Sequence, residues 1–240
     1  MMNQKINRYF KLSLLAGIVS VSAIAHDKSS INDPVTDSAV VTTTVTDKAP
    51  VKPVMAENDK KIQLMTKLAK LQYLSANFSQ TVIDGDGNTL QSGSGKLLLS
   101  KPNLVRWETT EPDESLIVSD GDTLWFFDPF IEQVSAYKLQ SAIANTPILL
   151  LTNQDQTLWN NYQVSQINQD TYLIHALDTN SQVKTLELNF DNDQLAGFVI
   201  LDATGQLSRV VLSDVDMLNP PPMEKFTFVL SEGIHLDDQR

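Results

Sequence analysis

The sequence predicts a mainly β (α+β) domain whose strands form a barrel or a strongly curved antiparallel sheet. Short apolar runs alternate with turn residues along the chain, most densely over residues 91–134. Residues 186–190 read LELNF, where apolar and polar side chains alternate as in a strand with one buried face. One helical segment precedes the strands and another interrupts them. About ten strands at this spacing are typical of a barrel or of a sheet that curves strongly.

The first 25 residues have the layout of a cleaved secretory signal peptide. Lys5, Arg8 and Lys11 give the start a positive charge without any acidic residue, and an apolar run then extends to Ala25. The run ends in the small-x-small sequence Ala-Ile-Ala, so we expect cleavage after Ala25. Its length of roughly 14 residues is shorter than the ~20 that a membrane-spanning helix needs. We therefore expect the chain to be exported.

Residues 26–58 are predicted to be a disordered linker. They are rich in Ser, Thr, Asp, Val and Pro, and they lack aromatic residues and sustained periodicity. Such a segment has too little apolar surface to offset the entropy lost on ordering. Residues 59–240 remain as one domain, which is long enough for a sizeable core. The chain has no Cys, so no disulfide stabilises that core.

The charge of the chain excludes some classes of partner. It has 29 acidic and 18 basic residues, and three of the basic ones lie in the signal peptide. The remaining 15 basic residues against 29 acidic ones leave a net charge of −14. Nucleic acid is excluded because its phosphates require a basic surface, and anionic lipid head groups are disfavoured for the same reason. Strong negative charge suits a protein that stays soluble and mobile.

The domain is predicted to open with a helix and a β-hairpin. Apolar residues recur at 3.6-residue spacing from Leu64 to Leu71. A strand is expected over 76–83, and the DGDGN turn at 84–88 sends the chain back. Turn residues then separate further strands. The apolar runs of these strands are 97–99, 104–107, 116–118 and 124–127.

The middle of the chain is predicted to be helical before the strands resume. Residues 138–144 are compatible with a helix. Thr146 then offers an N-cap, and Pro147 fits the first helical position because it needs no N–H there. Residues 148–151 are apolar on all sides, so this short helix should be buried. Later strands are expected at 162–167, 171–176, 186–190, 195–201, 207–215 and 225–229.

No motif in the sequence indicates an enzyme. The three histidines, His26, His175 and His235, are scattered, and no G-x-S-x-G nucleophile elbow occurs. The sequence at 84–88 begins like a calcium loop, but Thr89 stands where that loop needs glycine and its last ligand is also missing. A hairpin turn explains these residues better. We therefore expect no catalytic residue, no metal site and no cofactor.

Aromatic residues are concentrated in one stretch. They are Trp107, Trp125, Phe126, Phe127 and Phe130. Core packing explains each of them taken singly. A sheet covered by one small helical insert either packs solid or leaves space for a ligand, and the sequence leaves both alternatives open.

The range 95–134 resembles the LolA family of periplasmic lipoprotein carriers. The resemblance extends from about residue 59 to the C-terminus and leaves the linker outside. It rests on short motifs spread along the domain. These motifs are Phe78-Ser79-Gln80, Gly95, Pro102-Asn103, Trp107, residues 112–115, residues 118–121, Leu124-Trp125-Phe126, Pro129-Phe130 with Glu132-Gln133, Asn145-Thr146-Pro147 and the ending FTF…EGIHLDDQR.

The resemblance implies an incomplete, strongly curved antiparallel β-barrel covered by a small helical lid, with an apolar cavity for acyl chains. It implies a soluble periplasmic monomer. Such a carrier receives lipoproteins from an inner-membrane ABC transporter complex and delivers them to an outer-membrane receptor of the same fold. The chain itself has no Walker-type Gly-rich loop. An alternative with the same fold is a periplasmic sensor of mislocalised lipoproteins.

The resemblance also implies a lid latch. The family typically has Arg immediately before the proline of the Pro102 turn, and this Arg is implied to hold the lid shut through main-chain carbonyls. This chain has Lys101 there, which lacks the planar fork of Arg. We expect Lys101 to contact the main chain near Leu68 or Leu151. The acyl-chain cavity is expected to be lined by Phe78, Leu98, Val105, Trp107, Trp125, Phe127, Ile148 and Leu151.

Overall fold

A computed structural model describes residues 54–143, 146–153 and 155–240. The predicted signal peptide and all but the end of the predicted linker lie outside the described residues. The described strands form one 12-stranded sheet in the order β12-β6-β5-β4-β3-β2-β1-β11-β10-β9-β8-β7. Their bounds are β1 Tyr73–Ile83, β2 Thr89–Ser100, β3 Leu104–Glu111, β4 Ser115–Asp120, β5 Thr123–Asp128, β6 Gln133–Lys138, β7 Tyr162–Asn168, β8 Thr171–Ala176, β9 Val183–Asp191, β10 Gln194–Asp202, β11 Leu207–Asp216 and β12 His235–Asp238.

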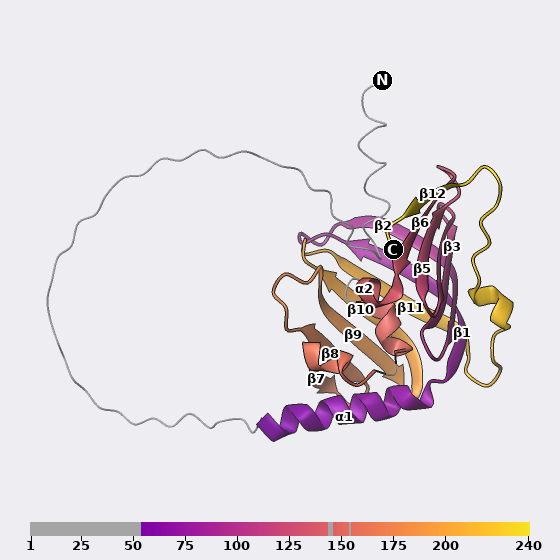
Figure 1. Cartoon of the computed structure of the whole chain (residues 1–240). Coiled ribbons are helices and arrows are strands. Elements are labelled where there is room, and N and C mark those ends of the chain that lie inside the picture. Colours follow the sequence, from indigo (N-terminus) through magenta and orange to yellow (C-terminus); the bar gives the residue numbers. More distant parts are fainter. Residues whose placement is uncertain (1–53, 144–145, 154) are drawn as a thin grey trace, which may run out of the picture.

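The sheet is antiparallel, strongly curved and open. Neighbouring strands pair antiparallel, except that β12 lies parallel to β6. The first strand, β1, joins the two halves because it pairs with β2 on one side and with β11 on the other. The terminal strands β12 and β7 do not pair with each other, so the barrel stays incomplete. The predicted fold class is confirmed, and Figure 1 shows the curvature of the sheet.

Helical segments cover one side of the sheet. The helix α1 (Val54–Lys70) runs along the end of the sheet beneath β7 and β8 (Figure 1). It begins at Val54, so it extends into the range 26–58 that the sequence suggested as linker. The long connection from β6 to β7 supplies α2 (Leu139–Ala142), η3 (Pro147–Leu151) and η4 (Leu158–Asn161). Among the described residues, no helix combines the length and the apolar content needed to span a bilayer.

The hydrophobic core lies between the concave face of the sheet and these helical segments. From α1 the core includes Leu64 and Leu68, as the 3.6-residue spacing predicted. All five residues of η3 are buried, which confirms the prediction for residues 148–151. Pro147 occupies the start of this segment, but the Thr146 side chain makes no capping hydrogen bond there.

Glycines allow neighbouring strands to approach where the sheet bends. The pairing register shifts between Ser94 and Gly95, and a Cβ on Gly95 would lie 1.9 Å from the carbonyl oxygen of Glu108 and 2.8 Å from the Phe78 ring. Gly197 also follows a register shift, and a Cβ there would lie 2.4 Å from the carbonyl oxygen of Val210. Such irregularities bend and twist a sheet, so these two glycines contribute to its curvature.

Two turn predictions have different outcomes. The residues at 84–88 form the β1–β2 hairpin turn, where the Asp84 carboxylate accepts hydrogen bonds from the backbone of Asp86 and Asn88. The strand predicted at 225–229 is wrong. Residues Met223–Phe226 form the 3-10 helix η5, and the carbonyl of Lys225 accepts a hydrogen bond from the Arg106 side chain. Three prolines at 220–222 remove backbone donors just before this segment, which disfavours strand pairing there.

Replacing Gly95 with Ala should destabilise the domain by about 1–3 kcal/mol, because the added methyl group forces backbone and ring shifts in a packed sheet. Gly85→Ala is the matched control, since nothing lies within 4 Å of a Cβ at that turn position. Urea unfolding of both variants measures the difference. Equal midpoints for the two variants would contradict the close approach at Gly95.

Candidate functional site

A stack of aromatic rings lies on the concave face of the sheet. The rings of Phe78 on β1 and Trp107 on β3 are stacked with centroids 3.9 Å apart, and Phe198 on β10 meets Trp107 edge-on at 6.1 Å. All three side chains are buried. Val105 lies two residues before Trp107 and belongs to the same core cluster, so both point to the concave side. These residues form the apolar floor of the candidate site.

Helical segments pack against this apolar floor and shield it from solvent. Ile148 and Leu151 of η3 and Leu68 of α1 belong to the same buried cluster as Phe78 and Trp107. The chain therefore fills most of its concave side with its own apolar side chains. We call α1, α2, η3 and η4 together the cover.

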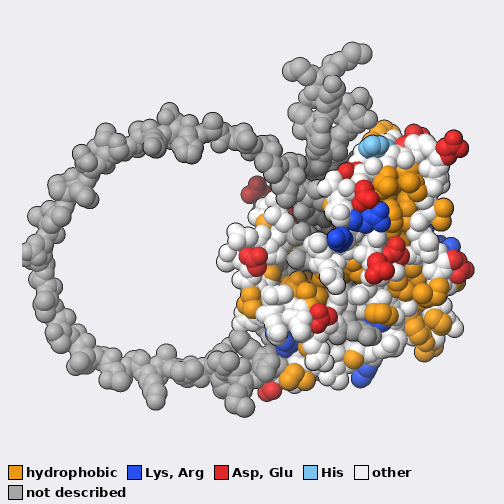
Figure 2. Space-filling view, in the orientation of Figure 1, with side chains coloured by type: hydrophobic (Ala, Val, Ile, Leu, Met, Phe, Trp, Pro, Cys, Tyr) orange, Lys and Arg blue, Asp and Glu red, His pale blue; other side chains and the backbone are white. Residues whose placement is uncertain are grey.

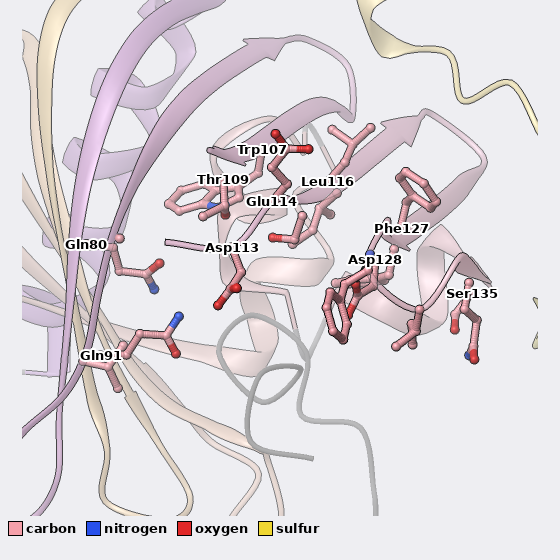
Figure 3. A pocket seen from close by; sticks show the side chains of 18 of the residues that line it. Gln80, Gln91, Trp107, Thr109, Asp113, Glu114, Leu116, Phe127, Asp128 and Ser135 are labelled. Atoms are coloured by element: carbon pink, nitrogen blue, oxygen red, sulfur yellow. Dashed lines mark hydrogen bonds between the residues drawn. The ribbon is translucent and has the colours of Figure 1, made fainter. Parts of the chain in front are cut away.

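A pocket of about 140 Å³ remains at the end of the sheet where β1 meets β2 and β3 meets β4. Its inner wall includes the buried side chains of Val82, Trp107 and Ile117. Its mouth is more polar. Figure 3 shows Gln80 and Gln91 on one wall and Phe127, Asp128 and Ser135 on the opposite wall, with Asp113 and Glu114 between them.

The pocket is small compared with a long acyl chain. An engineered cavity of about 150 Å³ in another protein holds one benzene molecule. The present pocket of about 140 Å³ is of that order and has no room for a long acyl chain. Any ligand of that length must displace side chains of the cover.

The β2–β3 turn holds the cover at the C-terminal end of α1. The Lys101 ammonium donates a hydrogen bond to the carbonyl oxygen of Leu68 at 2.5 Å, and the Lys101 backbone N–H donates to the carbonyl of Gln72 at 2.9 Å. Burial lowers the pKa of the Lys101 ammonium. The hydrogen bond to Leu68 offsets part of that desolvation cost, because an unpaired buried charge would be costly.

The same turn holds the end of η3 through Asn103, which the sequence placed in the Pro102-Asn103 motif without predicting this contact. The Asn103 N–H donates to the carbonyl of Thr152 at 3.3 Å, and the Asn153 side chain donates to the Asn103 side-chain oxygen at 3.1 Å. The Ser119 hydroxyl donates to the Asn103 carbonyl at 2.6 Å. Asn103 has φ +61°, a conformation that Asn tolerates better than most residues. The Pro-Asn sequence was the available signal for such a turn.

The structure brings most of the predicted cavity residues together. Phe78, Val105, Trp107, Ile148 and Leu151 belong to one buried cluster, and Trp107 also lines the pocket. Leu151 is buried in that cluster, whereas the side-chain hydrogen bond of Lys101 goes to Leu68.

Two of the predicted cavity residues lie on the other face of the sheet, so those two predictions are wrong. Leu98 alternates with the buried Leu97 and Leu99 and therefore points away from the core. Trp125 follows the core residue Leu124, and its ring stacks on Phe228 at 5.4 Å on the outer face.

Phe127 has an intermediate position. It lines the pocket, but its ring lies 5.6 Å from the ring of Phe228. Phe228 belongs to the C-terminal segment, which follows the outer surface of the sheet. Figure 2 shows hydrophobic side chains gathered on the side of the molecule where this segment lies, and Met223 and Val229 are exposed there.

Comparison with known proteins gives consistent matches. The family described as "Outer membrane lipoprotein carrier protein LolA" matches residues 69–229. The outer-membrane lipoprotein carrier protein of Actinobacillus succinogenes is 40% identical over 179 residues, which is 74% of this chain and 85% of that protein. That of Haemophilus influenzae is 40% identical over 188 residues, with 78% and 90% covered. A crystal structure of a LolA superfamily protein from Nitrosomonas europaea has 16% identity and a TM-score of 0.43, covering 68% of this chain and 97% of that one.

Asn103→Ala should lower the free energy of unfolding by about 1–3 kcal/mol, because it removes the side-chain bond to Asn153 and puts a Cβ-bearing residue without local polar support at positive φ. Asn103→Gly separates the two effects, since glycine adopts positive φ without strain. We expect the glycine variant to lose less stability in chemical denaturation. A larger loss for glycine than for alanine would contradict the strain at this position.

Proposed function

We infer the function from one premise: the chain belongs to the family of the outer-membrane lipoprotein carrier protein LolA. We propose that it carries lipoproteins by enclosing their acyl chains between the concave face of the sheet and the cover. The observation that carries this proposal is the apolar floor of Phe78, Trp107 and Phe198 beneath a cover of separate helical segments.

Enclosure of the acyl chains has a clear energetic purpose. Each CH₂ group exposed to water costs ~0.8 kcal/mol, so two or three long acyl chains cost roughly 20–35 kcal/mol. A carrier that buries these chains against its own apolar surface removes most of this cost. The acyl chains replace contacts that the cover makes with the floor in the closed form. Loading and opening are therefore coupled equilibria.

Lys101 is proposed to act as the latch of the cover. Its ammonium joins the β2–β3 turn to the carbonyl of Leu68 in α1, and this bond must break when α1 moves away. Lysine reaches a single carbonyl here, whereas the fork of an arginine could bind two acceptors. A latch based on lysine should therefore hold the closed form less tightly than one based on arginine.

The setting of this carrier is also proposed. The predicted signal peptide at 1–25 supports a periplasmic location. A carrier without a nucleotide-binding loop needs an ATP-driven inner-membrane complex to release the lipoprotein and an outer-membrane receptor to accept it. We propose a monomer without enzymatic activity in this role. No observation on the described residues favours the alternative of a lipoprotein sensor.

Two tryptophans on opposite faces of the sheet provide the test of acyl-chain binding. The chain has three tryptophans, so each is studied alone after the other two are replaced by Phe. A brominated fatty acid should quench the fluorescence of Trp107, which lies on the concave side, and should leave that of Trp125 largely unchanged. Equal quenching of both, or none of Trp107, would overturn the proposed site.

Lys101→Met should open the cover. The variant loses the bond to Leu68, and a net loss of about 1 kcal/mol raises the ratio of open to closed form about fivefold. The rate at which a fluorescent fatty acid binds reports this change. Lys96→Met is the control, because Lys96 is exposed on β2, the strand that leads into the Lys101 turn, and its side chain points away from the core. Faster binding in both variants would contradict a specific role of Lys101.

A further inference from the structure

The cover is fastened at a second place, on the half of the sheet opposite to Lys101. The Lys67 ammonium donates a hydrogen bond to the carbonyl oxygen of Asn192 in the β9–β10 turn and lies 3.4 Å from the carboxylate of Asp193. The neighbouring Lys70 ammonium lies 2.9 Å from the same carboxylate. Both lysines belong to the last turns of α1, so this part of the helix is attached to a turn more than 120 residues later in the chain.

The Lys67 contact is more than a surface ion pair. The Lys67 side chain is only 15% exposed, whereas Lys70 is 59% exposed. Its ammonium lies 4.8 Å from the centre of the Phe190 ring, which is buried in the core. A largely buried ammonium is stable only when it has polar partners, and Lys67 has three contacts here: the Asn192 carbonyl oxygen, the Asp193 carboxylate and the face of the Phe190 ring. Moving α1 away would break all three contacts at once.

The β9–β10 turn provides the acceptor groups for these two lysines. Asn192 has φ +57°, a conformation that Asn adopts readily in turns. Hydrogen bonds from Lys70 and Lys67 lower the pKa of the Asp193 carboxyl, so this group is a carboxylate at neutral pH. The turn therefore presents a carbonyl oxygen and a negative charge side by side.

The Lys101 contact and the Lys67 contacts attach α1 to different halves of the sheet. Lys101 lies in the turn between β2 and β3, which are on one side of β1 in the strand order. Asn192 and Asp193 lie in the turn between β9 and β10, on the other side of β1. The carbonyl of Leu68 and the ammonium of Lys67 are adjacent in α1, so one turn of the helix is held from both directions.

We propose that Lys67 and Asp193, supported by Lys70, form a second latch that sets the balance between the closed and open cover independently of Lys101. This proposal rests on the proposed function, because it assumes that the cover opens to admit acyl chains. Asp193 is a positioning residue in this scheme, since it acts on the cover and not on the acyl chains.

The test measures the position of α1 without any lipid. The chain has no Cys, so Ile62→Cys and Ile167→Cys introduce the only two attachment sites for spin labels. Ile62 lies on α1 and Ile167 on β7, and both side chains are exposed. Distance distributions from electron paramagnetic resonance then give the closed and open populations. Because no lipid is present, failure of the acyl-chain proposal would leave this measurement unaffected.

Asp193→Asn should raise the ratio of open to closed form about two- to fivefold, the range expected for loss of a partly exposed ion pair. Asp86→Asn is the matched control, because it makes the same charge change in the β1–β2 turn, where Asp86 is exposed. In the Lys67→Met background, Asp193→Asn should open the cover by less than it does in the parent protein, because only the Lys70 pair with Asp193 is then left to lose. Combining Asp193→Asn with Lys101→Met should multiply the two effects.

Three outcomes would overturn the second latch. The first is an unchanged distance distribution in Asp193→Asn while Lys101→Met opens the cover. The second is the same shift in Asp86→Asn, which would indicate an effect of net charge. The third is a lower unfolding midpoint in Asp193→Asn without any change in the populations, which would make the ion pair merely structural.

Discussion

The apolar concave face of the sheet must be shielded from water, and the rest of this structure depends on how that is achieved. The floor formed by Phe78, Trp107 and Phe198 would expose a large hydrophobic surface if the cover were absent. The connection from β6 to β7 and the helix α1 supply side chains that fill this space. These side chains occupy the place that we propose for acyl chains. The core of the closed form and the ligand site are thus the same region.

Two kinds of interaction hold the cover against the sheet. The apolar contacts of Leu64, Leu68 and η3 provide most of the burial, and acyl chains can replace them with contacts of the same kind. The hydrogen bonds and ion pairs from Lys67 and Lys101 have no counterpart in a hydrocarbon chain. They therefore give the closed form a stability that the ligand does not reproduce. Each contributes on the order of 1 kcal/mol, which is enough to shift a balanced equilibrium severalfold.

The sequence predicted the strands better than it predicted the faces of the sheet. Alternation in 186–190 identified β9, because one face of this strand is buried. Alternation alone does not say which face is concave, so Trp107 was placed correctly and Trp125 was not. Trp125 is covered from outside by Phe228, about 100 residues later in the chain, and no local pattern reports such a contact. The edge strand β12 was missed because it has only four residues, is rich in polar side chains and shows no apolar alternation.

The site was predictable where local chemistry defines it. The turn at Pro102 marked the position of Lys101, and the apolar run of η3 marked the buried segment of the cover. The contacts of Asn103 and Asp193 with the cover were not predicted, because their partners there are distant in the sequence. Turn residues with polar side chains are common, and only the fold shows which of them contact the cover.

The described sheet ends in two edge strands, β7 and β12, that do not pair with each other, so its radius is less constrained than that of a closed barrel. In a closed barrel the number of strands and their stagger fix the radius, so widening the interior requires broken backbone hydrogen bonds. Among the described strands β7 and β12 do not pair, so separating these two edges would break no backbone ladder between neighbouring strands. The width of the interior is therefore not fixed by closure of the sheet.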